Sequence, residues 1–125
     1  MKMSDLKSDL FDGKAIARTL LRESSARSKY FDQDLIGDPV WDLLLKLYDA
    51  EESKHVCATM DLFSGSRMSH ATLTRWLRVL ERRGMITTVA DPKSIEVGLV
   101  KLTRPAHRSM EAYLMDVSQR DPERF

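Results

Sequence analysis

The sequence predicts a mostly helical protein that carries one small β-hairpin and forms a single domain over residues 1–125. Apolar residues recur at helical spacing along most of the chain, whereas strand-like composition is confined to residues 85–102. No internal repeat and no linker rich in proline and glycine divides the sequence. A chain of 125 residues can bury about two thirds of the surface that it exposes when unfolded, so a hydrophobic core can hold it together.

The composition excludes several classes of protein. Cys57 is the only cysteine, which rules out an internal disulfide and a multi-cysteine zinc site. Because no secretory signal opens the sequence, we expect a cytoplasmic protein. Apolar runs such as Leu43–Leu45 are far too short to span a bilayer, so we expect no membrane partner.

The N-terminal part of the chain is predicted to contain an arm and a helix. Residues 1–12 are mostly polar and are consistent with a short helix or a loose arm. A narrow apolar stripe that includes Ile16, Leu20 and Leu21 predicts a helix over residues 15–30.

A second helix is predicted over residues 40–50, where a start signal precedes an apolar segment. Asp38 is a good N-cap, and Pro39 suits the first helical position. The segment is apolar on nearly all sides, which indicates a helix enclosed by its neighbours. The acidic residues in 49–52 are expected in a polar loop after this helix, with no catalytic role.

A short helix over residues 54–63 is predicted next. Val56, Thr59, Met60 and Phe63 recur at the spacing of one helical face, and a Ser-Gly-Ser sequence follows as a turn. The sole cysteine would then lie beside the apolar stripe of this helix.

A longer amphipathic helix is predicted over residues 69–83. Ser69 is a good N-cap, Arg82 and Arg83 suit the negative end of the helix dipole, and Gly84 is a typical stop. The apolar positions fall within an arc of about 100°, so the opposite side of the helix is expected to face outward. These apolar positions are Leu73, Trp76, Leu77 and Leu80.

The last predicted elements are a hairpin and a C-terminal helix. Residues 85–89 and 97–102 have strand-like composition around a turn over 90–94, which predicts a β-hairpin. Thr103 then caps a helix that precedes a polar tail over 118–125. The apolar positions of this helix are Ala106, Met110, Tyr113, Leu114 and Val117.

Charge is unevenly distributed, although the net charge of the whole chain is only +1. Residues 1–53 carry a net charge of −3, residues 54–104 carry +5, and residues 105–125 carry −1. A basic block between two acidic segments indicates that the block contacts a polyanion, although a solvated basic face would give the same count.

The basic block contains a helix, a turn, a second helix and a hairpin, which is the winged helix-turn-helix arrangement. An α-helix fits the major groove of B-DNA, so the outward face of residues 69–83 is expected to contact double-stranded DNA. Arg75 is the strongest candidate, while Arg67 and Lys93 are expected to hold phosphates. The expected DNA-binding residues are Arg67, Ser69, His70, Ala71, Thr72, Thr74, Arg75, Arg78 and Lys93.

The sequence MSHATLTRWLRVLERRGMI over residues 68–86, with later Asp-Pro and Leu-Thr pairs, resembles the bacterial MarR-type winged-helix transcriptional regulators. The resemblance covers about residues 39–117. Its most specific parts are Thr74-Arg75 and residues 80–86.

This resemblance implies a homodimer on a near-palindromic DNA operator, tuned in some relatives by a small ligand or by oxidation. It assigns residues 1–35 and 103–120 to dimerisation. Residues 39–102 would form the DNA-binding lobe, with the recognition helix at 69–83 and the wing at 85–102.

The wing departs from the pattern of that family. Relatives often carry an Asp-Arg-Arg sequence whose arginine enters the minor groove, whereas this chain has Ser94, Ile95 and Glu96 there. Because Glu96 would repel phosphate, we expect a weaker wing contact and DNA recognition mainly by the helix.

Four further residues each admit two interpretations. Trp41, Tyr48 and Trp76 are either core residues or the lining of a pocket for a small aromatic effector. Cys57 is either an inert packed thiol, which the usual burial of cysteine favours, or an oxidation sensor.

No enzymatic or metal site is predicted. His55, His70 and His107 are too dispersed to suggest a metal site. No Ser/His/Asp set, glycine-rich phosphate loop or matched acid pair occurs, so we expect no cofactor and no catalysis. The function we expect is a DNA-binding transcription regulator, and the alternative is a winged-helix module that binds protein instead of DNA.

Overall fold

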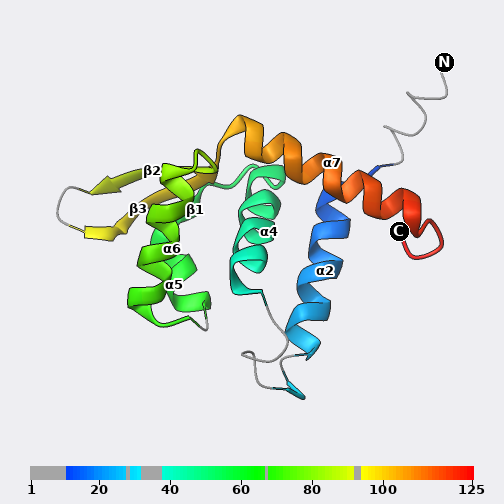
Figure 1. Cartoon of the computed structure of the whole chain (residues 1–125), viewed down its shortest axis with the longest axis horizontal. Coiled ribbons are helices and arrows are strands. Elements are labelled where there is room, and N and C mark those ends of the chain that lie inside the picture. The colour runs from blue at the N-terminus through cyan, green and yellow to red at the C-terminus, as the bar shows by residue number, and fades with distance from the viewer. Residues whose placement is uncertain (1–10, 28, 32–37, 67, 92–93) are drawn as a thin grey trace.

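The structure, a computed structural model, describes residues 11–27, 29–31, 38–66, 68–91 and 94–125, with the backbone alone for residues 90, 91 and 94–97. These residues form five helices and three strands, which confirms the mostly helical class with a small hairpin. In chain order they are α2 (Gly13–Arg27), α4 (Pro39–Glu52), β1 (Cys57–Ala58), α5 (Thr59–Gly65), α6 (His70–Arg82), β2 (Ile86–Asp91), β3 (Ser94–Leu102) and α7 (Arg104–Arg120) (Figure 1).

Helix α7 runs along one side of the molecule and joins its two ends (Figure 1). At one end, α5 and α6 lie beside the small sheet, and at the other end α2 packs against α7. Helix α4 stands between them, and its leucines contribute more of the buried core than those of any other described helix. Buried apolar residues from all five of these helices and from β2 and β3 form one hydrophobic core.

Helix α4 begins as the sequence predicts and continues further than expected. The Asp38 carboxylate accepts hydrogen bonds from the backbone N–H groups of Val40 and Trp41, both at 3.1 Å. The helix then runs to Glu52, so the acidic residues in 49–52 lie in its last turn and the expected loop there is wrong. Alanine and glutamate are strong helix formers, so this polar last turn can continue the helix, whose preceding turns are buried in the core.

The predicted helix over residues 54–63 is wrong in its first half. Residues 57 and 58 form β1, which pairs antiparallel with β3 in the register Cys57↔Val100, and α5 begins only at Thr59. Val56 and Met60, expected on a buried face, are 58% and 61% exposed. The spacing of apolar residues favoured a helix here, but residues 57 and 58 instead form hydrogen bonds with β3, some 40 residues away in the sequence.

The hairpin is confirmed and is part of a three-stranded antiparallel sheet with the order β1-β3-β2. The register between β2 and β3 runs from Ile86↔Leu102 to Ala90↔Gly98, with an irregularity between Ala90 and Asp91. The side chains of Ile86, Val100 and Leu102 are each 1% exposed, so this end of the sheet belongs to the core.

Helices α2 and α7 both differ from their predicted bounds. Helix α2 begins at Gly13, two residues early, and ends at Arg27 instead of continuing to residue 30. Helix α7 has the predicted Thr103 cap but extends to Arg120, into the segment expected to be a polar tail. Among the described residues, no helix combines the length and apolar character needed to cross a membrane.

Candidate nucleic-acid interface

The start and the end of α6 follow from its sequence. The Ser69 hydroxyl accepts a hydrogen bond from the Thr72 backbone N–H at 3.2 Å, which caps the helix. Gly84 adopts a φ of +70° just after the helix, a conformation that glycine reaches without steric strain. Leu73, Leu77 and Leu80 are 1–3% exposed, so one face of α6 is fixed in the core.

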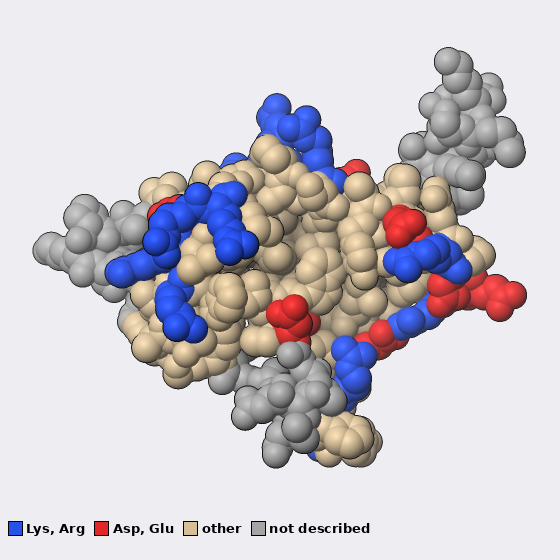
Figure 2. Space-filling model, viewed as in Figure 1, with Lys and Arg blue, Asp and Glu red and all other residues tan. Residues whose placement is uncertain are grey.

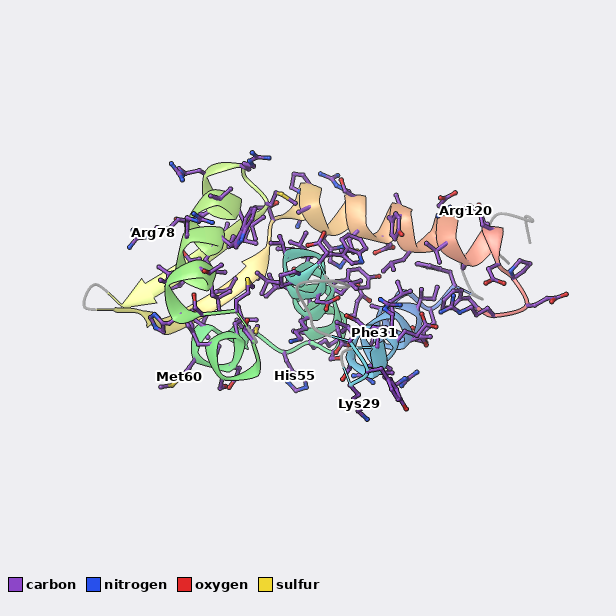
Figure 3. All side chains as sticks on the ribbon, turned by 60° about the horizontal axis from the view of Figure 1, so that its bottom comes forward. Lys29, Phe31, His55, Met60, Arg78 and Arg120 are labelled. Carbon is purple, nitrogen blue, oxygen red and sulfur yellow. The ribbon has the colours of Figure 1, made fainter. Side chains whose placement is uncertain are left out.

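The opposite face of α6 carries a basic stripe formed by Arg75, Arg78 and Arg82, with Ala71 at its N-terminal end. These four residues lie within an arc of about 60° when each residue advances by about 100°. All four are exposed. Lysine and arginine side chains gather over α6 in the space-filling view, and Arg78 projects away from the body of the molecule (Figures 2 and 3).

No acidic residue in the described part of the chain lies within ion-pair distance of this basic stripe. Arginine side chains without an internal partner keep their five N–H donors available for phosphate oxygens or guanine edges. The stripe is therefore exposed, and its arginines are not paired with any acidic side chain that the structure describes. Arg82 was expected on the outward side of the helix and at its end but not among the DNA-binding residues, although it lies on the same helical arc as Arg75 and Arg78.

The polar candidates at the start of α6 make local contacts. The Ser69 hydroxyl donates a hydrogen bond to the Thr72 hydroxyl at 2.8 Å, and the Thr74 hydroxyl donates to the His70 carbonyl at 2.9 Å. The His70 ring packs on Phe63 of α5, with 4.3 Å between ring centroids. The contact between His70 and Phe63 thus joins α5 to α6, whereas the two hydroxyl hydrogen bonds stay within the start of α6.

Two side-chain contacts hold the hairpin in place beside α6. The Glu81 carboxylate in α6 accepts a hydrogen bond from the Thr88 hydroxyl in β2. The Thr103 hydroxyl, between β3 and α7, donates a hydrogen bond to the Gly84 carbonyl at 2.7 Å. The base of the hairpin and the middle of β2 are therefore fixed relative to α6.

Several wing and turn candidates lie outside the described residues. Arg67 and Lys93, the expected phosphate contacts, are among them. The same holds for the side chains of Ser94, Ile95 and Glu96, on which the expectation of a weak wing contact depends.

The environment of Cys57 disfavours the thiolate. The side chain is half-buried, and burial raises the pKa of its thiol, an effect that Asp61 increases and Lys46 opposes. Because the thiolate is the form that reacts with oxidants, a raised pKa lowers the reactivity of this cysteine at neutral pH.

An apolar cavity of about 520 Å³ lies between α4, the end of α6 and the start of α7. Trp41 and Tyr113 meet edge to face in its wall, with ring centroids 5.1 Å apart. Of the three predicted pocket residues, only Trp41 lines it. Tyr48 is buried in the core and stacks on His107, and Trp76 is half-buried on α6. The lining residues are Trp41, Leu44, Arg83, Gly84, Met85, Leu102, Pro105, Ala106, Ser109, Met110 and Tyr113.

Comparison with known proteins finds a match only at the level of solved structures. No family model and no curated protein matches the chain.

Staphylococcus aureus MepR, solved in a DNA-binding conformation, is 19% identical, and the match covers 86% of this chain and 76% of that chain with a TM-score of 0.53. A MepR mutant is 17% identical over 90% of this chain and 81% of that chain, with a TM-score of 0.52. The heme sensor protein PefR, solved with heme and carbon monoxide, is 16% identical, and the match covers 83% of this chain and 68% of that chain with a TM-score of 0.50. At such identities the likeness concerns the fold, and this chain has the winged helix-turn-helix fold of the MarR-type regulators.

Proposed function

We propose that this protein is a transcription regulator that binds double-stranded DNA with α6 in the major groove. The observation that carries the proposal is the basic stripe of Arg75, Arg78 and Arg82, which is exposed opposite the buried leucines of the same helix. The N-terminal residues of a recognition helix contact base edges, which assigns base recognition to Arg75 and Ala71. Arg78 and Arg82 then contact the phosphate backbone as the helix leaves the groove.

The polar residues at the start of α6 complete this interface. Ser69, His70 and Thr72 lie at the helix N-terminus, where backbone N–H groups favour a phosphate. Thr74 lies beside the basic stripe and can exchange its internal hydrogen bond for one to a base or a phosphate. Arg67 and Lys93 remain proposed phosphate contacts on the sequence argument alone.

The second part of the proposal is that the protein acts as a homodimer through α2 and α7, within the predicted segments 1–35 and 103–120. A groove of about 650 Å³ lies where α2, the second half of α7 and the C-terminal residues meet. Phe11, Ile16, Met115 and Phe125 supply apolar surface to it. A partner subunit seated there would place two recognition helices on one near-palindromic operator.

The third part is that a small aromatic effector binds in the cavity beside Trp41 and Tyr113. Aromatic and aliphatic side chains dominate its wall, and Arg83 and Ser109 add polar groups that can orient a ligand. Arg83 directly follows α6, so an occupant of this cavity would contact the end of the recognition helix.

DNA binding is tested by selecting fragments of genomic DNA on the full chain and measuring affinity for a selected site by fluorescence anisotropy. We expect Arg75→Ala to weaken specific binding by about 1–3 kcal/mol, because a good arginine–base contact is worth that much. Lys46→Ala is the control, since it removes one exposed positive charge from α4, outside both the basic stripe and the segments proposed for dimerisation.

Equal affinity of the Arg75→Ala and Lys46→Ala variants, or no DNA retained at low salt, would overturn the proposal. Capture of a protein that survives nuclease treatment, and that Arg75→Ala abolishes, would instead favour the protein-binding module.

Sedimentation of the chain with and without the selected site tests the dimer. A thermal-shift screen of aromatic compounds, repeated on Trp41→Ala, tests the effector cavity.

A further inference from the structure

The last residue of α4 and the first two turns of α7 bring together three side chains with metal-binding atoms. Glu52 ends α4, while His107 and Glu111 are separated by one helical turn on the same face of α7. His107 Nε2 lies 2.9 Å from a Glu52 carboxylate oxygen, and His107 Nδ1 lies 3.7 Å from a Glu111 carboxylate oxygen. One donor atom from each residue can be chosen so that all three lie within 4.8 Å of one another.

The imidazole at the centre of this cluster is held by the core. The ring of His107 stacks on the ring of Tyr48, with centroids 4.9 Å apart and an angle of 29° between the planes. Tyr48 is only 1% exposed, so its ring is a fixed platform. The His107 side chain is itself only 22% exposed, whereas both carboxylates reach solvent. The cluster is therefore ordered on one side and accessible to an ion on the other.

The electrostatics of the cluster favour a cation. Two carboxylates flank one imidazole, and no lysine or arginine in the described part of the chain lies within ion-pair distance of Glu52 or Glu111.

We propose that Glu52, His107 and Glu111 form a binding site for a divalent first-row transition-metal ion. Metal–ligand bonds of about 2.0–2.2 Å place donor atoms roughly 3–3.5 Å apart. Because one ion binds one imidazole nitrogen, the carboxylate that faces the other nitrogen has to rotate toward the ion. An imidazole nitrogen combined with carboxylate oxygens suits Zn²⁺, Mn²⁺, Fe²⁺ or Co²⁺, whereas Mg²⁺ and Ca²⁺ prefer oxygen ligands alone. Water would complete the coordination on the solvent side.

The predicted absence of a metal site rested on the wide separation of the three histidines in the sequence. The absence was also expected because no Cys, Asp or Glu is clustered at ligand spacing in the sequence, whereas the structure combines His107 with one glutamate from another part of the chain and one from its own helix. Glu52 and His107 are 55 residues apart, so only the packing of α4 against α7 brings them together. An ion at this site would fix the end of α4 to the start of α7.

The first test titrates the metal-free full chain with Zn²⁺ and follows binding by calorimetry. We expect one ion per chain, and at least about a tenfold loss of affinity in each of Glu52→Gln, His107→Gln and Glu111→Gln. Even the loss of a residue that only hydrogen-bonds to a metal ligand lowers metal affinity by about tenfold or more. His55→Gln and Glu123→Gln are matched controls on exposed residues outside the cluster, and they should bind as the parent does. Circular dichroism of each variant verifies that the fold is intact.

The second test replaces Zn²⁺ by Co²⁺ and records the visible absorption spectrum. We expect ligand-field bands that disappear in His107→Gln, with no thiolate-to-cobalt charge-transfer band. A charge-transfer band would place the ion on Cys57 and overturn the assignment. Absence of stoichiometric binding, or unchanged affinity in all three cluster variants, would show that Glu52, His107 and Glu111 form only an ion-paired group.

Discussion

The two ends of this molecule use their charged side chains in opposite ways. Where α2 meets α4 and the C-terminal residues, charges pair within the chain: Arg18 contacts Asp49 at 2.8 Å, and Arg124 contacts Glu23. On α6, by contrast, the three arginines of the basic stripe have no acidic partner among the described residues. Figure 2 shows the same contrast, with mixed charges at the α2–α7 end and arginine and lysine alone over most of α6.

This difference explains why net charge is a poor guide to function here. Charge that is paired internally is screened from a distant ligand, whereas unpaired charge on a fixed helix creates a local field. The overall +1 therefore hides a surface suited to a polyanion. Removing a charge at the α2–α7 end should therefore lower stability, whereas removing an arginine of the basic stripe should lower binding and leave stability unchanged.

The largest expected effect separates the two faces of α6. Leu77→Ala should lower the free energy of unfolding by about 2–5 kcal/mol, because Leu77 is 1% exposed and its removal leaves a cavity. Arg78→Ala, on the exposed face one residue later, should change it by less than about 0.5 kcal/mol. Urea denaturation followed by circular dichroism measures both. Similar losses for the two variants would mean that the basic stripe is part of the structural core.

A second comparison concerns the close packing of α2 on α4. A Cβ atom at Gly13 would collide with the hydroxyl and ring of buried Tyr48, so Gly13→Ala should cost about 1–3 kcal/mol of stability. Gly65→Ala is the control, because a Cβ there meets open space. Thermal unfolding of the two variants checks this, and an unchanged midpoint for Gly13→Ala would contradict the packing described.

The smallest expected effect tests the charge contrast itself. Arg18→Ala should lower stability by about 0.2–1 kcal/mol, because it removes a half-exposed ion pair with Asp49, and the loss should shrink as salt is added. Arg75→Ala should leave stability unchanged within error, since Arg75 has no internal partner among the described residues. Denaturation at low and high salt compares them. A salt-dependent loss in Arg75→Ala would remove the contrast.

Elements with local signals were predictable from the sequence. Asp38-Pro39, Ser69, Gly84 and Thr103 mark helix boundaries through contacts within a few residues, and the structure has each boundary there. The 100° periodicity also identified the outward face of α6, including the exposed Arg75. Elements that depend on distant partners were not predictable. Strand β1 exists only because β3 offers it hydrogen bonds.

The sequence by itself determined the order of the helices and the hairpin, the amphipathic character of α6 and the concentration of positive charge around it. These properties depend on dihedral preferences, caps and residue spacing, which act over a few residues. The tertiary structure decided which charges stay unpaired, where the apolar cavity opens beside Trp41, and that Glu52 meets His107 and Glu111. Such groupings depend on the packing of helices far apart in the chain, which no local pattern specifies.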